Sequence, residues 1–243
     1  PIFLVIGILL CALALSMIVP AVVDALAGNS DWQIFAISSG VTLFVGGAMT
    51  LTSRAGNLHL SVRQAFVMTT FSWIALTLFA CIPFVFSELQ LSFTDAFFEA
   101  MSGITTTGST VITGLDGVPP GILLWRALLQ WLGGIGIIVM AIAVFPMLRV
   151  GGMQLFRMES SDPSEKALPR AAEIASAISL IYLGLTFLCA IAYWLAGMSG
   201  FDAIAHSMTT IATGGYSTTD GSIGSFESWQ IDLIAIIGMI VGS

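Results

Sequence analysis

Charged residues are scarce in this sequence. They make up 9% of its 243 residues, whereas 57% of the residues are hydrophobic. A water-soluble domain carries charge on about a quarter of its residues, so this composition excludes an ordinary soluble fold and indicates that the lipid bilayer surrounds most of the chain. The formal net charge of −7 also argues against nucleic acid as a partner.

Residues that commonly carry chemistry are few as well. The three cysteines, Cys11, Cys81 and Cys189, all fall in apolar stretches, where thiols behave as small hydrophobic groups. Neither a disulfide framework nor a zinc spacing is present, and we expect no metal role for His206. The sequence therefore predicts that the chain is not an enzyme and holds no organic cofactor.

Long stretches without charge dominate the chain. Five of them can each cross a hydrocarbon core, which takes about 20 apolar residues, and a sixth begins at Leu233 and runs to Ser243. The five cover residues 1–23, 32–53, 65–87, 127–148 and 174–201. We expect an all-α polytopic membrane protein. We also expect the chain to be a piece of a longer one, because the sixth stretch stops inside a span.

The basic residues gather on one predicted face of the membrane. If each stretch crosses once, the two loops that hold most of them lie on the same side. These loops contain six of the seven basic residues, namely Arg54, Arg63, Arg149, Arg157, Lys166 and Arg170. The positive-inside rule makes this side, and with it the N-terminus, cytoplasmic. Ten of the fourteen acidic residues fall on the opposite face, where they either attract cations or form ordinary charged loops.

The chain repeats one order of segments, in which a long helix, a short polar segment and another long helix follow one another. We predict an N-terminal transmembrane hairpin at 1–55, a first repeat at 56–150, a cytoplasmic linker at 151–170, and a second repeat at 171–243 with a truncated last helix. A shift of 107 positions lays one short segment on the other. Seven of the seventeen residues from Ser92 to Gly108 are then identical.

Each short segment opens with a helix-start signal. Ser92 precedes Asp95 by three residues, and Ser199 precedes Asp202 in the same way. A helix over residues 95–104 would be about 15 Å long, which is half the hydrocarbon thickness. The chain must then turn back inside the membrane with unpaired carbonyl groups, which is tolerated where the backbone is buried in protein or lines a watery cavity. A pore meets that condition.

Threonine and glycine follow both short helices. Residues 105–110 read T-T-T-G-S-T and residues 212–217 read A-T-G-G-Y-S. A dehydrated K+ ion needs a stack of oxygens, which carbonyl groups and threonine hydroxyls supply, while glycine permits the torsions that aim the carbonyls. Both strings resemble the T-V-G-Y-G filter of potassium channels without its last glycine. The residues predicted to bind K+ are Thr105, Thr106, Thr107, Gly108, Ser109, Ala212, Thr213, Gly214, Gly215 and Tyr216.

Together with neighbouring motifs, these strings make the sequence resemble the Trk/Ktr/HKT potassium transporter superfamily, and within it the bacterial TrkH-type uptake subunit. The other motifs are the run from Gln130 to Gly136 and the triplet Phe145-Pro146-Met147. The resemblance implies four channel-type repeats in a full-length chain. Gly108 and Gly215 would then be the filter glycines of the first two repeats, so this chain would supply two of four filter strands.

The resemblance also implies the wider setting of the protein. It implies potassium uptake across the bacterial inner membrane, a homodimer, and contact with a cytoplasmic nucleotide-binding regulatory subunit of the TrkA type. One rival function is a secondary transporter coupled to Na+ or protons, but such transporters are typically built on inverted repeats, whereas these two copies run in the same direction. Another is a non-transporting membrane scaffold, which leaves the paired strings unexplained.

Arg126 is the one basic residue predicted on the outer side. Because an unpaired charge beside hydrocarbon is costly, we expect it to pair with Glu99 or Asp116. The glycines that follow are expected to permit close packing against the neighbouring short helix rather than to form a hinge; they are Gly133, Gly134 and Gly136. Tryptophans near the span ends are expected to anchor the membrane interface; they are Trp32, Trp125, Trp131, Trp194 and Trp229.

Overall fold

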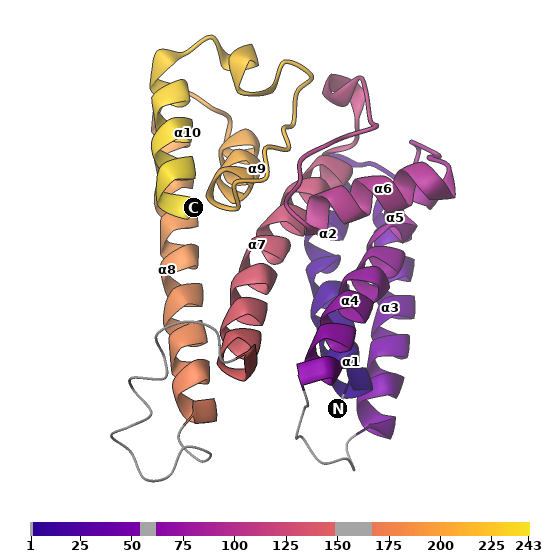
Figure 1. The fold of residues 1–243 in the computed structure, drawn as a ribbon. Coiled ribbons are helices and arrows are strands. Elements are labelled where there is room, and N and C mark those ends of the chain that lie inside the picture. The colour runs from indigo at the N-terminus through magenta and orange to yellow at the C-terminus, as the bar shows by residue number, and fades with distance from the viewer. Residues whose placement is uncertain (1, 54–61, 149–166) are drawn as a thin grey trace.

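The computed structural model describes residues 2–53, 62–148 and 167–243, and every regular element in these ranges is a helix (Figure 1). Most of the predicted linker at 151–170 lies outside the described residues. Four of the basic residues on which the predicted cytoplasmic face depends also lie outside the described residues: Arg54, Arg149, Arg157 and Lys166.

The N-terminal part forms a hairpin in which α1 (Ile2–Ser16) continues into α2 (Ile18–Ala27) and then returns as α3 (Trp32–Thr52). Glycines permit α1 and α3 to pack closely. A methyl group on Gly7 would lie 2.8 Å from the Gly46 carbonyl oxygen, and one on Gly46 would lie 2.8 Å from the Gly7 carbonyl oxygen. Small residues bring membrane helices together in this way because lipid offers no hydrophobic driving force.

Two copies of the same helix order follow the hairpin. The first consists of α4 (Val62–Ala80), α5 (Ile82–Phe86), α6 (Phe93–Ile104), η1 (Leu115–Gly117) and α7 (Pro120–Leu148). The second consists of α8 (Ala167–Leu195), α9 (Gly200–Ile211), η3 (Ser222–Phe226) and α10 (Trp229–Gly242). The short helices α6 and α9 lie at the end of the bundle away from the N-terminus, and α7 packs against both (Figure 1).

The lengths and composition of the helices suit a bilayer. Among the described residues, four segments are long and apolar enough to cross it: Ile2–Ala27, Trp32–Thr52, Arg63–Phe86 and Glu173–Leu195. Helix α7 has 29 residues, which corresponds to about 44 Å of length. The predicted all-α polytopic membrane fold is confirmed.

Both short helices are capped by the predicted serines, and α6 begins at Phe93, two residues before the predicted start at residue 95. The Ser92 hydroxyl oxygen accepts a hydrogen bond from the Asp95 N–H at 3.2 Å, and the Ser199 hydroxyl oxygen accepts one from the Asp202 N–H at 3.1 Å. Each aspartate accepts a hydrogen bond from its serine hydroxyl at 2.7 Å instead of reaching the serine N–H as in a full capping box. Each helix has 12 residues, so both are too short to cross the membrane.

Two long helices end or begin elsewhere than their charge-free stretches suggest. Helix α7 begins at Pro120 rather than at residue 127. Proline suits a first helical turn, and the Asp24 carboxylate accepts a hydrogen bond from the Gly121 N–H at 2.6 Å. Helix α8 ends at Leu195 rather than at residue 201, because the chain turns at Gly197, whose φ is 108°, before α9 begins.

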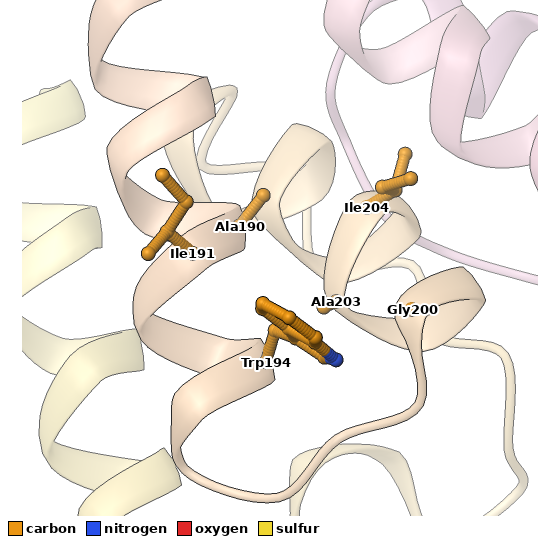
Figure 2. Close-up of a pocket in the computed structure, with 6 residues that line it drawn as sticks. All are labelled: Ala190, Ile191, Trp194, Gly200, Ala203 and Ile204. Carbon is orange, nitrogen blue, oxygen red and sulfur yellow. The ribbon is translucent and has the colours of Figure 1, made fainter.

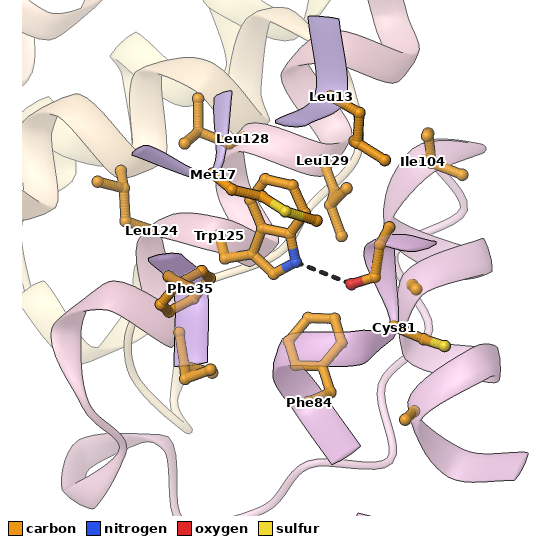
Figure 3. Close-up of a cluster of buried hydrophobic side chains, with 14 of the residues drawn as sticks. Leu13, Met17, Phe35, Cys81, Phe84, Ile104, Leu124, Trp125, Leu128 and Leu129 are labelled. Carbon is orange, nitrogen blue, oxygen red and sulfur yellow. Dashed lines mark hydrogen bonds between the residues drawn. The ribbon is translucent and has the colours of Figure 1, made fainter. Parts of the chain in front are cut away.

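Trp125 lies inside the protein, so the expectation that it anchors the membrane interface is wrong. Its ring is fully buried, and its indole N–H donates to the Ala80 carbonyl oxygen at 3.0 Å (Figure 3). Phe35 of α3 meets the ring edge to face, with centroids 6.1 Å apart. The core around Trp125 thus joins the hairpin, α4 and α7, and gives α7 a fixed place beside α6.

Candidate functional site

The chain reverses direction after each short helix. We call residues 105–110 the first reversal and residues 212–217 the second reversal. Positive φ angles occur at equivalent places in the two, at Thr106 (57°) and Thr213 (53°), and again at Gly108 (80°) and Gly215 (81°). A non-glycine residue rarely adopts a positive φ, so the repetition of this conformation 107 residues apart is a structural duplication and not only a sequence pattern.

Hydrogen bonds repeat with the same offset. The Thr107 N–H donates to the Ser102 carbonyl oxygen, and the equivalent Gly214 N–H donates to the Thr209 carbonyl oxygen, both at 2.9 Å. One residue earlier, the N–H groups of Thr106 and Thr213 also bond to their own short helices, each at 3.0 Å. The two reversals therefore leave the ends of α6 and α9 along the same backbone path.

The two reversals meet at Gly108. A methyl group on Gly108 would overlap the Gly214 carbonyl oxygen, so the two backbones come close together at two glycines of the predicted site. Four of the predicted site residues are exposed, namely Thr107, Ser109, Thr213 and Gly215. Ala212, Gly214 and Tyr216 are instead buried against the protein.

Ser109, predicted to be a K+ ligand, contacts two hydroxyl groups of the protein through its carbonyl oxygen. Its carbonyl oxygen accepts hydrogen bonds from the Ser102 hydroxyl at 2.6 Å and from the Tyr216 hydroxyl at 3.1 Å. The Tyr216 hydroxyl has one hydrogen and shares it with the Glu99 carbonyl oxygen at 2.9 Å. The contact with Tyr216 brings the side chain of the second reversal against the backbone of the first.

Arg126 pairs with Glu99, one of the two partners that the sequence offered. The Arg126 Nε donates to the Glu99 Oε1 at 2.8 Å, and both side chains are buried. The guanidinium also donates to the Ser217 carbonyl oxygen at 2.9 Å and to the Thr110 hydroxyl at 3.1 Å, and it lies 4.2 Å from the ring centre of Tyr216. A buried charge is stable when it is paired and hydrogen-bonded. Through Thr110 and Ser217, Arg126 of α7 therefore bonds to both reversals.

Two of the three α7 glycines permit close packing, as expected, and the third does not. A methyl group on Gly133 would overlap the Ile104 carbonyl oxygen at the end of α6. One on Gly134 would lie 2.6 Å from the Tyr182 hydroxyl and 3.4 Å from the Ala212 side chain. A methyl group on Gly136 would meet open space.

The structure adds two site residues to which the sequence assigned no role. Asp220 Oδ1 accepts hydrogen bonds from the N–H groups of Gly114 and Leu115, each at 3.0 Å, and so joins the loops after the two reversals. Gln130 is fully buried and accepts a hydrogen bond from the Tyr216 N–H at 3.0 Å. The spacing of four residues between Arg126 and Gln130 was the available signal, since it places both on one face of a helix.

Elsewhere, an apolar pocket lies between α8 and α9 (Figure 2). Its lining consists of Ala190, Ile191, Trp194, Gly200, Ala203 and Ile204, and these residues offer no charged or hydroxyl group to a cation. Among the described residues, His, Cys, Asp and Glu do not gather in groups of three or more that could hold a metal ion.

Comparison with known proteins decides the family. The family model described as TrkH, cation transport protein, matches residues 32–243. The chain belongs to the TrkH family. This family consists of cation transport proteins and is not an enzyme class. The match also confirms the family resemblance that was inferred from the Thr and Gly strings and the Gln130 to Gly136 run.

Curated TrkH-family relatives match nearly the whole chain. The Trk system potassium uptake protein TrkH of Vibrio parahaemolyticus is 43% identical over 242 residues, which is 98% of this chain and 50% of that protein. The protein of the same name from Escherichia coli K12 is 43% identical over 240 residues, with the same coverage. TrkG of Escherichia coli K12 is 37% identical over 232 residues, 94% of this chain and 48% of the relative. The chain spans about half the length of the curated relatives it matches.

A solved TrkH structure has the same fold. The crystal structure of the potassium transporter TrkH from Vibrio parahaemolyticus superposes with a TM-score of 0.88 at 41% sequence identity, and the match covers 99% of this chain and 48% of that one. The chain is therefore a multi-pass membrane protein of the TrkH fold.

Proposed function

We propose that the two reversals are two strands of a potassium selectivity filter, and that the full-length protein takes up K+ as the translocating subunit of a Trk-type system. The observation that carries this proposal is the meeting of two backbone segments of the same conformation at Gly108 and Gly214. Segments of this kind can replace the water around a monovalent cation with fixed oxygens.

Thr105, Thr106, Thr107 and Gly108 provide backbone oxygens on the first strand in this proposal. Ala212, Thr213, Gly214, Gly215 and Tyr216 do so on the second strand. Ser109 is the fifth residue of the first strand in this proposal, and its carbonyl oxygen also accepts a hydrogen bond from the Ser102 hydroxyl at 2.6 Å. The C-terminal ends of α6 and α9 precede the reversals, and the partial negative charge at a helix C-terminus adds a smaller attraction for a cation.

Relatives named as potassium uptake proteins support the choice of K+ as the substrate. We further propose that the protein lies in the bacterial inner membrane with a cytoplasmic N-terminus, forms a homodimer, and contacts a nucleotide-binding regulatory subunit of the TrkA type. The division into 1–55, 56–150, 151–170 and 171–243 remains part of the proposal. A coupled transporter of inverted repeats is disfavoured because α6 and α9 lie at the same end of the bundle (Figure 1).

The test uses the full-length protein in liposomes, in which rubidium and sodium influx are measured side by side. Gly108→Ser adds a side chain where the Gly214 carbonyl oxygen lies, so we expect it to lower rubidium influx and the preference for rubidium over sodium. Gly136→Ser is the matched control, since its side chain enters open space on α7. Equal influx and equal preference in wild type and Gly108→Ser would contradict the proposed filter.

A further inference from the structure

Gln130 lies where the two reversals meet. It is fully buried on α7, and its Oε1 accepts the Tyr216 N–H of the second reversal. A methyl group on Gly214 would overlap the Gln130 side-chain amide, and a methyl group on Gly108 would lie 3.7 Å from its Nε2. The Gln130 amide therefore contacts the second reversal and lies beside the first where Gly108 and Gly214 meet.

The contact explains why residue 214 is glycine. Gly214 is absent from the residues with positive φ, so its φ does not call for a glycine. Residue 214 is glycine because of the limited space, since the Gln130 amide fills the volume that a side chain would need. The glycine and the glutamine thus form a fitted pair between α7 and the second reversal.

The Gln130 side chain is an unusual choice for a position that only fills space. Its Nε2 has no hydrogen-bond partner in the described part of the chain. Because a buried amide hydrogen without a partner is costly, a similarly long apolar side chain such as methionine would suit simple packing better. The amide oxygen, in contrast, satisfies a backbone N–H of the second reversal.

Two neighbouring contacts on the same face of α7 fix the position of the Gln130 amide along the helix axis. Arg126 lies one turn before Gln130 and donates to the Ser217 carbonyl oxygen at 2.9 Å. Gly133 lies about one turn after it and packs on the Ile104 carbonyl group where α6 ends. Helix α7 thus contacts the two repeats at three positions about one turn apart, namely Arg126, Gln130 and Gly133. A rigid helix with these contacts can keep the separation of the repeats constant.

We propose that Gln130 is a positioning residue that sets the gap between the two filter strands, and thereby the preference for K+ over Na+. This inference rests on the proposed filter. K+ and Na+ differ in radius by only a few tenths of an ångström, and the filter selects between them through the size and number of its oxygen sites. A change in strand separation should therefore alter selectivity before it alters the maximal rate of uptake.

The experiment measures rubidium and sodium influx in liposomes that contain the full-length protein as wild type, Gln130→Met or Gln130→Asn. Methionine keeps the length and loses the acceptor for Tyr216, whereas asparagine keeps an amide that is one methylene shorter. We expect each variant to lower the rubidium-to-sodium influx ratio by about tenfold, the size of effect that loss of one buried hydrogen bond can have. Gln33→Met is the control, because Gln33 is exposed at the start of α3.

The possible outcomes separate this inference from the proposed function. If wild type shows no rubidium influx or no preference for rubidium, the proposed function itself is wrong. If wild type is selective and either Gln130 variant keeps its ratio, the role of Gln130 is overturned. Loss of folded protein in both variants would also overturn it, since Gln130 would then serve stability rather than selectivity.

Discussion

Glu99 and His206 occupy the same place in the two copies, 107 residues apart, and each holds a hydroxyl group of its own reversal. The Thr110 hydroxyl donates to the Glu99 carboxylate at 2.9 Å, and His206 Nε2 lies 3.0 Å from the Ser217 hydroxyl oxygen. Thr110 and Ser217 are themselves equivalent positions. The two copies thus support the reversals with the same geometry and different chemistry.

The surroundings account for this difference. Glu99 is paired with Arg126 of α7, whereas the corresponding helix of the second copy, α10, contains no basic residue. We therefore expect His206→Glu to destabilise the protein by about 3 kcal/mol or more, since an unpaired buried charge costs that much. His206→Gln should cost far less, because its amide can still bond to Ser217. Thermal unfolding in detergent compares the two, and equal losses would contradict the prediction.

The ion pair between Glu99 and Arg126 predicts a rescue experiment. Glu99→Arg and Arg126→Glu should each abolish rubidium influx, because each places two like charges together in a buried site. The double exchange should restore part of the influx. The recovery will be incomplete, because Glu99 also accepts the Val111 N–H and Arg126 also bonds to Ser217. A double variant no better than the worse single variant would argue against the pair.

The two reversal glycines should respond unequally to alanine. Both have a positive φ, which costs an L-residue about 1–2 kcal/mol. A methyl group on Gly108 also overlaps the Gly214 carbonyl oxygen, whereas one on Gly215 meets open space. Gly108→Ala should therefore lower rubidium influx and thermal stability more than Gly215→Ala. The reverse order would show that the two backbones do not meet as described.

Trp125 predicts an effect on stability alone. Trp125→Phe keeps an aromatic ring beside Phe35 but removes the hydrogen bond to the Ala80 carbonyl oxygen. The expected loss is about 1 kcal/mol, the usual contribution of one hydrogen bond, with the rubidium-to-sodium ratio unchanged. Trp32→Phe is the control, since Trp32 is exposed on the surface. A thermal midpoint equal to that of wild type would contradict the role assigned to Trp125.

Asp31 predicts a dependence of stability on pH. Burial raises the pKa of its carboxyl group, and the hydrogen bond from the Glu88 N–H opposes that rise only in part. The folded state then holds the proton more tightly than the unfolded state, so stability falls as pH rises through the raised pKa. Asp31→Asn should be more stable than wild type near neutral pH, and the difference should vanish below about pH 4. A constant difference across thermal unfolding curves at these pH values would contradict this reading.

Local patterns in the sequence were enough for the elements that depend on neighbours along the chain. The apolar runs predicted spanning helices, and Ser92 and Ser199 predicted where α6 and α9 begin, because a capping hydroxyl acts on an N–H three residues away. The start of α7 was missed because the charge of Arg126 interrupted the apolar run. That charge is buried beside Glu99, a partner 27 residues earlier in the chain.

Composition, the 107-residue repetition and the helix-start signals determined by themselves that this is an all-α membrane protein with two short helices, each followed by a repeated Thr and Gly segment. The tertiary structure alone decided that Gln130 meets Tyr216, that the Tyr216 hydroxyl contacts the Ser109 carbonyl group, and that Trp125 is buried. The physical reason is range. Hydrophobicity and capping act within a few residues, whereas these contacts join residues from 45 to 107 positions apart, and only the packed helices bring such residues together.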